Sequence, residues 1–355
     1  MLDQALLILN RSSATGHSSD DTAAILRAYK QHFAFAQRRV SIVTSHAEVC
    51  AAAGAFQESC DTSGVILSGG GAGTLRAVVE GLCAKHGRLP DPDHICVAPL
   101  RLGSGNVLAK TFGVSKDPDQ AMAIAARNVI ARQIDLCSVM RCDVDGRTKF
   151  AMTLIGLGQF GRIPRDLAGW HQRFPRLRSG IARVLGVERL TQVEYRIFTA
   201  ARGLQCALWP RQMETVEIET RRGCSRVGLF AGAVANFAVP GLPFTPSHGP
   251  EELALSGFIL CDSVVSPLGI LRDRNRIVRT FQVTPGHPVT IRLVSPKPTP
   301  FFLDEDPMSF CHTLQIGIAG TLGIVPGTVC EQFENSSVHL ESEAHHVVTH
   351  LHTWN

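Results

Sequence analysis

Residues 65–82 read VILSGGGAGTLRAVVEGL. An apolar run is followed by a glycine-rich turn and then by apolar residues at helical spacing, namely Leu75, Val78, Val79 and Leu82. This order predicts a buried strand, a tight turn and an amphipathic helix. Many proteins hold phosphate at such a turn, because glycine lets backbone N–H groups approach an anion and the helix N-terminus favours negative charge.

The same alternation extends over the first part of the chain. Strands are expected at residues 5–10, 39–45, 64–70 and 94–100, and helices at 21–33, 46–56, 74–86 and from 105 onward. Strands that alternate with helices in this way predict a mostly parallel sheet that is covered by helices on both faces.

From about residue 140 the pattern changes to short strand-like runs separated by turns, one of which is YRIFTAARG at 195–203. Such runs predict an antiparallel β-sandwich or a similar domain, with a helical insert near 164–190. We therefore expect an α/β nucleotide-binding domain over 1–138 and a β-sandwich lipid or substrate domain over 139–328. A C-terminal tail over 329–355 is expected to follow, with packing against the first domain as an option.

The composition is that of a globular protein with a substantial core. The chain has 355 residues, 45% of them hydrophobic, a net charge of +4 and eleven cysteines without a CxxC pair. We interpret the cysteines as reduced thiols of a cytoplasmic protein, and we expect no signal peptide and no nucleic-acid partner. The uncharged run 227–244 is long enough for a membrane-spanning helix, but its glycines and prolines favour buried strands joined by a turn.

Three loops that follow expected strands are rich in small residues. They comprise residues 10–16 (NRSSATG), 69–74 (GGGAGT) and 103–106 (GSGN). Loops of this kind meet at the carboxyl ends of parallel strands, where ligands bind. Their spacing matches neither the P-loop nor the GxGxxG fingerprint. One such loop alone would be read as an ordinary tight turn, whereas three in one domain favour a phosphate site.

Together the three loops, with GGAGTLRAVVEGL at 70–82 and GSGNVLAKTFG at 103–113, resemble the diacylglycerol kinase catalytic-domain family. That family includes bacterial lipid kinases and sphingosine kinases and is distantly related to NAD kinases. The resemblance implies an α/β nucleotide domain followed by a β-sandwich, with the active site in the cleft between them. It implies a kinase that uses ATP and Mg²⁺ to phosphorylate a lipid hydroxyl.

The resemblance also implies roles for individual residues. Asp304, in LDEDPM at 303–308, matches the position of the general base in the bacterial lipid kinases, although the same residues would also suit a solvated acidic turn. The metal ligands are left open. The residues expected to bind the nucleotide are Asn10, Ser13, Gly16, Gly70, Gly71, Gly73, Thr74, Gly103, Ser104 and Asn106.

The chain departs from the family pattern at several positions. The family turn reads GGDGT, and Ala72 stands here in place of the aspartate, so the turn keeps its shape but loses a carboxylate that could hold Mg²⁺ or accept a proton. Arg101 stands where a proline is usual and could reach phosphate or lie on the surface. Phe160 replaces an acidic residue, which weakens the sphingosine kinase interpretation, and Asp306 replaces a glutamate.

A basic and aromatic segment suggests reversible contact with an anionic membrane surface. Trp170 and Phe174 lie among Arg162, Arg165, Arg173, Arg176, Arg178, Arg183 and Arg189, and a second cluster holds Arg272, Arg274, Arg276 and Arg279. A solvated helical face remains an alternative.

Two functions other than lipid phosphorylation stay open. One is a kinase-fold protein that binds nucleotide or lipid without transferring phosphate, which Ala72 favours. The other is an NAD-kinase-like phosphotransferase that acts on a soluble acceptor. We expect a peripheral membrane protein with a lipid substrate, and a homodimer is an open alternative.

Overall fold

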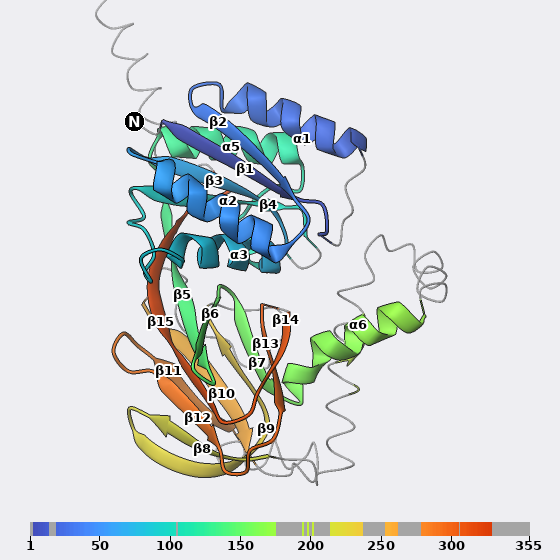
Figure 1. The fold of residues 1–355 in the computed structure, drawn as a ribbon, viewed down its shortest axis with the longest axis vertical. Coiled ribbons are helices and arrows are strands. Elements are labelled where there is room, and N and C mark those ends of the chain that lie inside the picture. The colour runs from blue at the N-terminus through green and yellow to red at the C-terminus, as the bar shows by residue number, and fades with distance from the viewer. Residues whose placement is uncertain are drawn as a thin grey trace, which may run out of the picture.

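Four parallel strands form the centre of the N-terminal region (Figure 1). The computed structural model describes residues 3–13, 19–103, 106–174, 194, 197–198, 201, 214–236, 253–261, 278–304 and 306–328. The strands lie in the order β4-β3-β1-β2. Their bounds are β1 Gln4–Asn10, β2 Gln37–Val43, β3 Gly64–Gly70 and β4 Ile95–Arg101.

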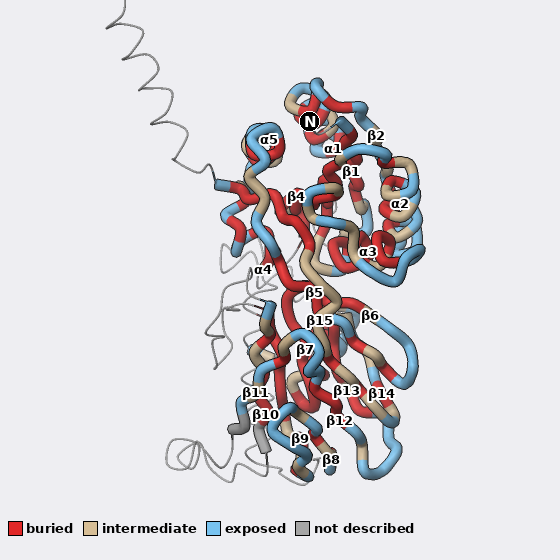
Figure 2. Tube along the Cα trace, turned by 90° about the vertical axis from the view of Figure 1, so that its left-hand side faces the viewer, coloured by how far each residue is buried: buried red, intermediate tan, exposed pale blue. Residues whose placement is uncertain are grey.

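Helices cover both faces of this sheet, with α2 and α3 on one side and α5 on the other (Figure 2). They are α1 Ser19–His32, α2 His46–Ser59, α3 Ala72–Cys83, α4 Val107–Thr111 and α5 Pro118–Ile130. Alternate side chains of β1 explain the two layers, since Leu6 and Ile8 pack with α2 and α3 while Leu7 and Leu9 pack with α1 and α5. The α/β region expected from the sequence is confirmed.

The strands from residue 135 onward pair antiparallel with one another, as expected from their sequence pattern. A separate apolar core fills this region. The strands are β5 Asp135–Val144, β6 Arg147–Ala151, β7 Leu154–Gly158, β8 Glu214–Thr220, β9 Gly223–Ala235, β10 Leu255–Cys261, β11 Val278–Val283, β12 Val289–Leu293, β13 Thr299–Leu303, β14 Asp306–Phe310 and β15 Thr313–Ile324.

The long strand β15 joins the two regions, and Figure 1 shows it running from the antiparallel strands toward the parallel sheet. It pairs antiparallel with β12 and β5, and its last residues pair parallel with β4, with Gly323 beside Cys96. Beyond the strand, Val325 donates its N–H to the carbonyl of Val97 at 2.9 Å. The chain therefore ends its described part packed on the parallel sheet, and the tail over 329–355 lies outside the described residues.

Two sequence expectations beyond residue 160 can be compared with the structure. The helical insert begins with a 3₁₀ turn, η1 Phe160–Arg162, and the helix α6 Ile163–Arg173, while most of the rest of 164–190 lies outside the described residues. The strand expected at 195–203 is wrong, because Ile197, Phe198 and Ala201 are helical.

The uncharged run at 227–244 contains the end of β9, so its described part is a strand, as the sequence analysis favoured. Within the described ranges, no helix has both the length and the apolar character that crossing a membrane requires.

Asp304 braces the turn between β6 and β7. Its backbone has a φ of 49°, a left-handed conformation that aspartate tolerates better than most residues. Its carboxylate accepts hydrogen bonds from the N–H groups of Met152, Thr153 and Leu154 at 2.6, 2.8 and 3.1 Å and from the Thr153 hydroxyl at 2.6 Å. The side chain is buried, and this burial raises the pKa of Asp304 while the hydrogen bonds lower it.

Asp145 braces a second turn in the same way, but at the surface. Its φ is 47°, and its carboxylate accepts the N–H groups of Cys311, His312 and Thr313 at 2.7, 2.9 and 2.9 Å. The two aspartates therefore differ chiefly in their exposure to water.

We predict that Asp304→Asn lowers the free energy of unfolding by about 1–3 kcal/mol more than Asp145→Asn does. The amide nitrogen of the new side chain faces buried N–H donors that it cannot accept from, whereas water can replace the lost acceptor at position 145. Urea denaturation of the two variants measures the difference. An equal or smaller loss for Asp304→Asn would show that the buried carboxylate is not an anchor of this turn.

Candidate functional site

The three glycine-rich loops follow β1, β3 and β4, which are neighbours in the parallel sheet. They therefore lie side by side at the carboxyl ends of these strands, where open α/β sheets bind ligands. Of the residues expected to bind the nucleotide, Gly16 and Ser104 lie outside the described residues. The others are on the three loops or at the start of α3.

Side-chain hydrogen bonds tie the first loop to the other two. The Asn10 amide donates to the Thr74 hydroxyl at 2.9 Å, which joins the end of β1 to the first turn of α3. The Ser13 hydroxyl donates to the carbonyl of Leu102 at 3.1 Å, which joins the first loop to the third. The Asn10 side-chain oxygen also accepts the N–H of Ser12 at 3.0 Å. These bonds bring residues that are far apart in the sequence into one arrangement.

The second and third loops are in direct backbone contact. A Cβ on Gly103 would overlap the Cα and nitrogen of Gly71, so only glycine at position 103 allows the loops to approach this closely. Gly73, in contrast, has no neighbouring atom within 4 Å of the position where a Cβ would lie. The two glycines thus have different roles. Gly103 allows the second and third loops to contact each other, and the absence of a side chain at Gly73 leaves open space above the start of α3.

Asn106 shapes its own loop. Its side-chain oxygen accepts the N–H of Gly103 at 2.9 Å, and its side-chain nitrogen donates to the Gly103 carbonyl at 2.6 Å. The residue is buried and has a φ of 51°, a left-handed conformation in which asparagine is enriched. Asn106 is therefore positioned to hold the third loop, and both of its amide atoms are already engaged.

The helix α3 begins directly at the glycine turn. Gly71 is its N-cap and provides no side chain to cap it, and Ala72 is its first residue. The exposed end of the helix offers backbone N–H groups and the positive end of the helix dipole, which together favour an anion. None of the three loops contains an aspartate or a glutamate. The site therefore suits the phosphates of a nucleotide, but its loops offer no carboxylate ligand to Mg²⁺.

Arg76 connects α3 to the turn that carries Asp304. The guanidinium is almost fully buried and donates to the Asp306 carboxylate at 2.6 Å and to the Leu303 carbonyl at 3.4 Å. It also lies 3.7 Å from a carboxylate oxygen of Glu80, one helical turn along α3. The Arg76 guanidinium therefore holds the turn between β13 and β14 against α3.

The sequence analysis did not single out Arg76. The signal that could have found it is a lone arginine within the apolar residues of 75–79, on a helix that the sequence already predicted to be buried. For Arg101, the structure shows a half-buried side chain that donates to the Val114 carbonyl at 3.3 Å.

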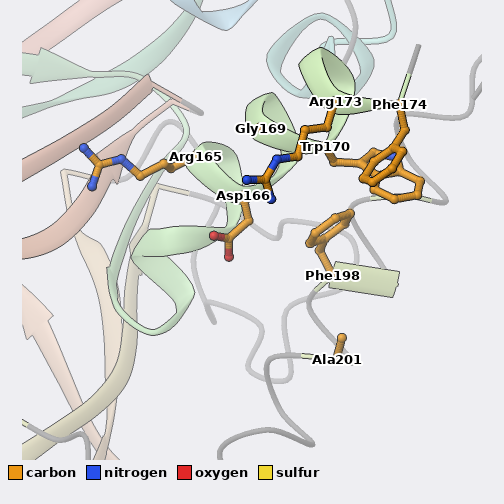
Figure 3. A pocket seen from close by; sticks show the side chains of 8 residues that line it. All are labelled: Arg165, Asp166, Gly169, Trp170, Arg173, Phe174, Phe198 and Ala201. Carbon is orange, nitrogen blue, oxygen red and sulfur yellow. The ribbon is translucent and has the colours of Figure 1, made fainter. Parts of the chain in front are cut away.

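A hollow lies beside α6, in the basic and aromatic segment (Figure 3). Its volume is about 470 Å³. The ring centroids of Trp170 and Phe174 lie 4.7 Å apart. The rings of Trp170 and Phe198 are arranged edge-to-face, with their centroids 6.2 Å apart. The residues that line the hollow are Arg165, Asp166, Gly169, Trp170, Arg173, Phe174, Phe198 and Ala201.

A buried carboxylate holds this aromatic group in place. Glu194 accepts the indole N–H of Trp170 at 3.2 Å and lies 2.8 Å from the imidazole Nε2 of His171. Trp170 is thereby oriented, whereas Phe174 remains 44% exposed.

Comparisons with known proteins agree with this architecture. Three solved structures from Bacillus anthracis str. Sterne have the same fold, one described as a diacylglycerol kinase and two as candidates for that activity. Their sequences are 13%, 13% and 14% identical to this chain, with TM-scores of 0.58, 0.60 and 0.57. The alignments cover 91%, 91% and 92% of this chain and 97%, 97% and 99% of the others. No curated protein matches the sequence.

At such low identity the structural likeness establishes the fold alone. The sequence adds a match to a family model, because residues 4–139 match that of the diacylglycerol kinase catalytic domain. The match includes β1 through α5 and all three loops, and it confirms the resemblance noted in the sequence. Residues 4–139 therefore carry the sequence pattern of a diacylglycerol kinase catalytic domain.

Proposed function

We propose that this chain is an ATP-dependent lipid kinase, which transfers the γ-phosphate of ATP to a lipid hydroxyl. The observation that carries the proposal is the three-loop arrangement at the carboxyl ends of β1, β3 and β4, in a domain of a lipid kinase family. The description of one structural neighbour as a diacylglycerol kinase supports an acceptor of that type.

The loops supply the groups that a triphosphate needs. Backbone N–H groups at the start of α3 and the dipole of that helix would hold phosphate oxygens. Thr74 accepts the Asn10 amide at its hydroxyl oxygen, which leaves the hydroxyl hydrogen to donate to a phosphate. Phosphoryl transfer depends largely on such positioning and on charge stabilisation. When bound, Mg²⁺ would neutralise phosphate charge, but none of the three loops offers it a carboxylate ligand.

Asp304 stays our prediction for the general base that accepts the proton of the attacking hydroxyl. Burial raises its pKa, which strengthens it as a proton acceptor, while four hydrogen bonds from the Met152–Leu154 segment oppose this effect. Arg76 supports this placement, because its bonds to Leu303 and Asp306 hold the residues on both sides of Asp304 against α3.

Ala72 favours a second candidate function, which is binding of nucleotide or lipid without phosphate transfer. A methyl group at the first residue of α3 neither ligates a metal nor accepts a proton. The shape of the turn does not depend on this residue, so the loops can hold a nucleotide in either case.

The hollow beside α6 supports a lipid substrate over a soluble acceptor. The exposed ring of Phe174, beside half-buried aromatic rings and arginines, suits an anionic membrane surface, where rings enter the headgroup region and cations meet lipid phosphates. We therefore propose reversible membrane contact through α6.

Phosphate transfer tests the two candidate functions. We predict that Ala72→Asp raises the kcat for lipid phosphorylation by at least about tenfold, the factor that about 1.4 kcal/mol of transition-state stabilisation supplies. The assay follows radiolabelled γ-phosphate from ATP into a panel of lipids that includes diacylglycerol. Gly73→Asp is the matched control, because it adds the same charge one residue along α3.

If only Ala72→Asp transfers phosphate, the natural chain is a binding protein with an intact site. If neither chain transfers phosphate to any lipid, the kinase proposal is wrong.

Nucleotide binding tests the three-loop arrangement. We predict that Gly103→Ala abolishes the rise in melting temperature that a non-hydrolysable ATP analogue causes, because the new methyl group pushes the second and third loops apart. The overpacking itself should cost about 1–3 kcal/mol of stability. Gly169→Ala, on α6 and away from the three loops, adds a methyl group that meets no atom within 4 Å and should keep both stability and the nucleotide effect. Normal nucleotide binding by Gly103→Ala would contradict the arrangement.

Membrane contact is tested at two phenylalanines of matched exposure. Phe174, directly after α6, is 44% exposed, and Phe35, after α1, is 42% exposed. We predict that Phe174→Ala weakens sedimentation with phosphatidylglycerol-containing vesicles by about fivefold, the loss expected when about 1 kcal/mol of apolar burial is removed. Phe35→Ala should bind as the natural chain does. Equal effects of the two substitutions would exclude α6 as the docking element.

A further inference from the structure

Three metal-ligating side chains meet on the face of the parallel sheet that α2 and α3 cover. His46 and Cys50 are one helical turn apart on α2, and Glu80 comes from α3. One ligand atom from each residue lies within 4.8 Å of the other two. The cluster is separate from the glycine-rich loops, and the proposed kinase reaction does not use it.

The backbone around the cluster is held rigidly. The helices α2 and α3 lie side by side (Figure 2), and their contact is so close at Gly81 that a Cβ there would overlap the carbonyl of Cys50. The first turn of α2 is capped by the Ser45 hydroxyl, which accepts the N–H of Glu48 at 3.3 Å. A site whose ligands stand on two tightly packed helices loses little entropy when an ion binds.

The hydrogen-bonding capacity of the ligand atoms is only partly satisfied within the protein. The imidazole Nε2 of His46 lies 2.8 Å from one carboxylate oxygen of Glu80, so a proton occupies the position between them. The other oxygen of Glu80 is buried without a hydrogen-bond partner, and its ion-pair distance to Arg76 is 3.7 Å. An acceptor of this kind is costly unless something satisfies it.

We propose that His46, Cys50 and Glu80 bind a divalent ion of the zinc type. Imidazole nitrogen, thiolate sulfur and carboxylate oxygen are the three ligand types that zinc takes in proteins, at about 2.0–2.3 Å, and the thiolate disfavours Mg²⁺ and Ca²⁺. The half-exposed position of His46 leaves room for water as the fourth ligand of a tetrahedral ion.

The exchange balances in charge. When all three side chains carry the protons that the ion would displace, an imidazolium, a thiol and a carboxylate sum to zero. The ion enters as two protons leave, one from His46 and one from Cys50, and a neutral imidazole, a thiolate, a carboxylate and a divalent cation again sum to zero. The positive charges nearby, Arg76 and Lys149, therefore meet no added net charge.

Cobalt(II) is the probe, because it takes zinc sites and its bond to thiolate gives an intense ultraviolet charge-transfer absorption. We expect the full chain, reduced and free of metal, to develop this absorption with one equivalent of cobalt(II), and zinc to abolish it. Histidines near the C-terminus, between His339 and His352, cannot produce this absorption because they offer no sulfur.

Variants assign the absorption to the cluster. Cys50→Ser should abolish it, His46→Gln and Glu80→Gln should weaken cobalt(II) binding by at least about tenfold, and Cys224→Ser should leave it unchanged, since Cys224 is an exposed cysteine outside the cluster. Melting temperatures in the presence of a chelator establish that each variant is folded. If no thiolate absorption appears, or if it persists in Cys50→Ser, the proposal is wrong.

Zinc-dependent stability provides a second readout. Zinc should raise the melting temperature of the natural chain and of Cys224→Ser, and should raise that of Cys50→Ser less. An equal rise in all three proteins would place zinc elsewhere and overturn the proposal. None of these readouts depends on kinase activity.

Discussion

The contact between the backbones of Gly71 and Gly103 is the constraint on which the candidate nucleotide site depends. It brings the turn before α3 against the loop after β4, and a side chain at position 103 would force them apart. Asn10 and Ser13 then fasten the loop after β1 to both, through Thr74 and through the carbonyl of Leu102. The site is consequently a property of three neighbouring strand ends rather than of one motif, which explains why neither standard phosphate-binding fingerprint is present.

Two connections couple this site to the antiparallel region. The strand β15 pairs with strands of both regions and so makes one continuous sheet. The buried guanidinium of Arg76 then ties α3, whose first turn forms part of the site, to Asp306 and to the carbonyl of Leu303, on either side of Asp304. Since Glu80 lies on the other side of Arg76, the His46–Cys50–Glu80 cluster is joined to the same chain of charges. An ion held there would be linked through Arg76 to the residues on either side of Asp304.

Much of this architecture could be predicted from the sequence, because it rests on local patterns. Apolar runs that alternate with segments of helical spacing predicted the α/β region, and the short strand-like runs predicted the antiparallel region. Glycines at the strand ends predicted the three loops. The sequence could not show which long-range partners would satisfy buried polar groups. Arg76 pairs with Asp306, which is 230 residues away in the sequence. Asp304 accepts hydrogen bonds from the Met152–Leu154 turn, which is about 150 residues away. The strand expected at 195–203 failed because a short apolar run suits a strand or a helix equally well, and its described residues, Ile197, Phe198 and Ala201, are helical.

Together the three loops are proposed to hold the phosphates of a nucleotide, and a crystal structure of the chain with a non-hydrolysable ATP analogue tests this. We predict that the phosphates lie over the first turn of α3, between the loop that follows Asn10 and the loop at Gly103, with the Thr74 hydroxyl donating to a phosphate oxygen. A nucleotide bound with its phosphates elsewhere, or no nucleotide at saturating concentration, would contradict the claim.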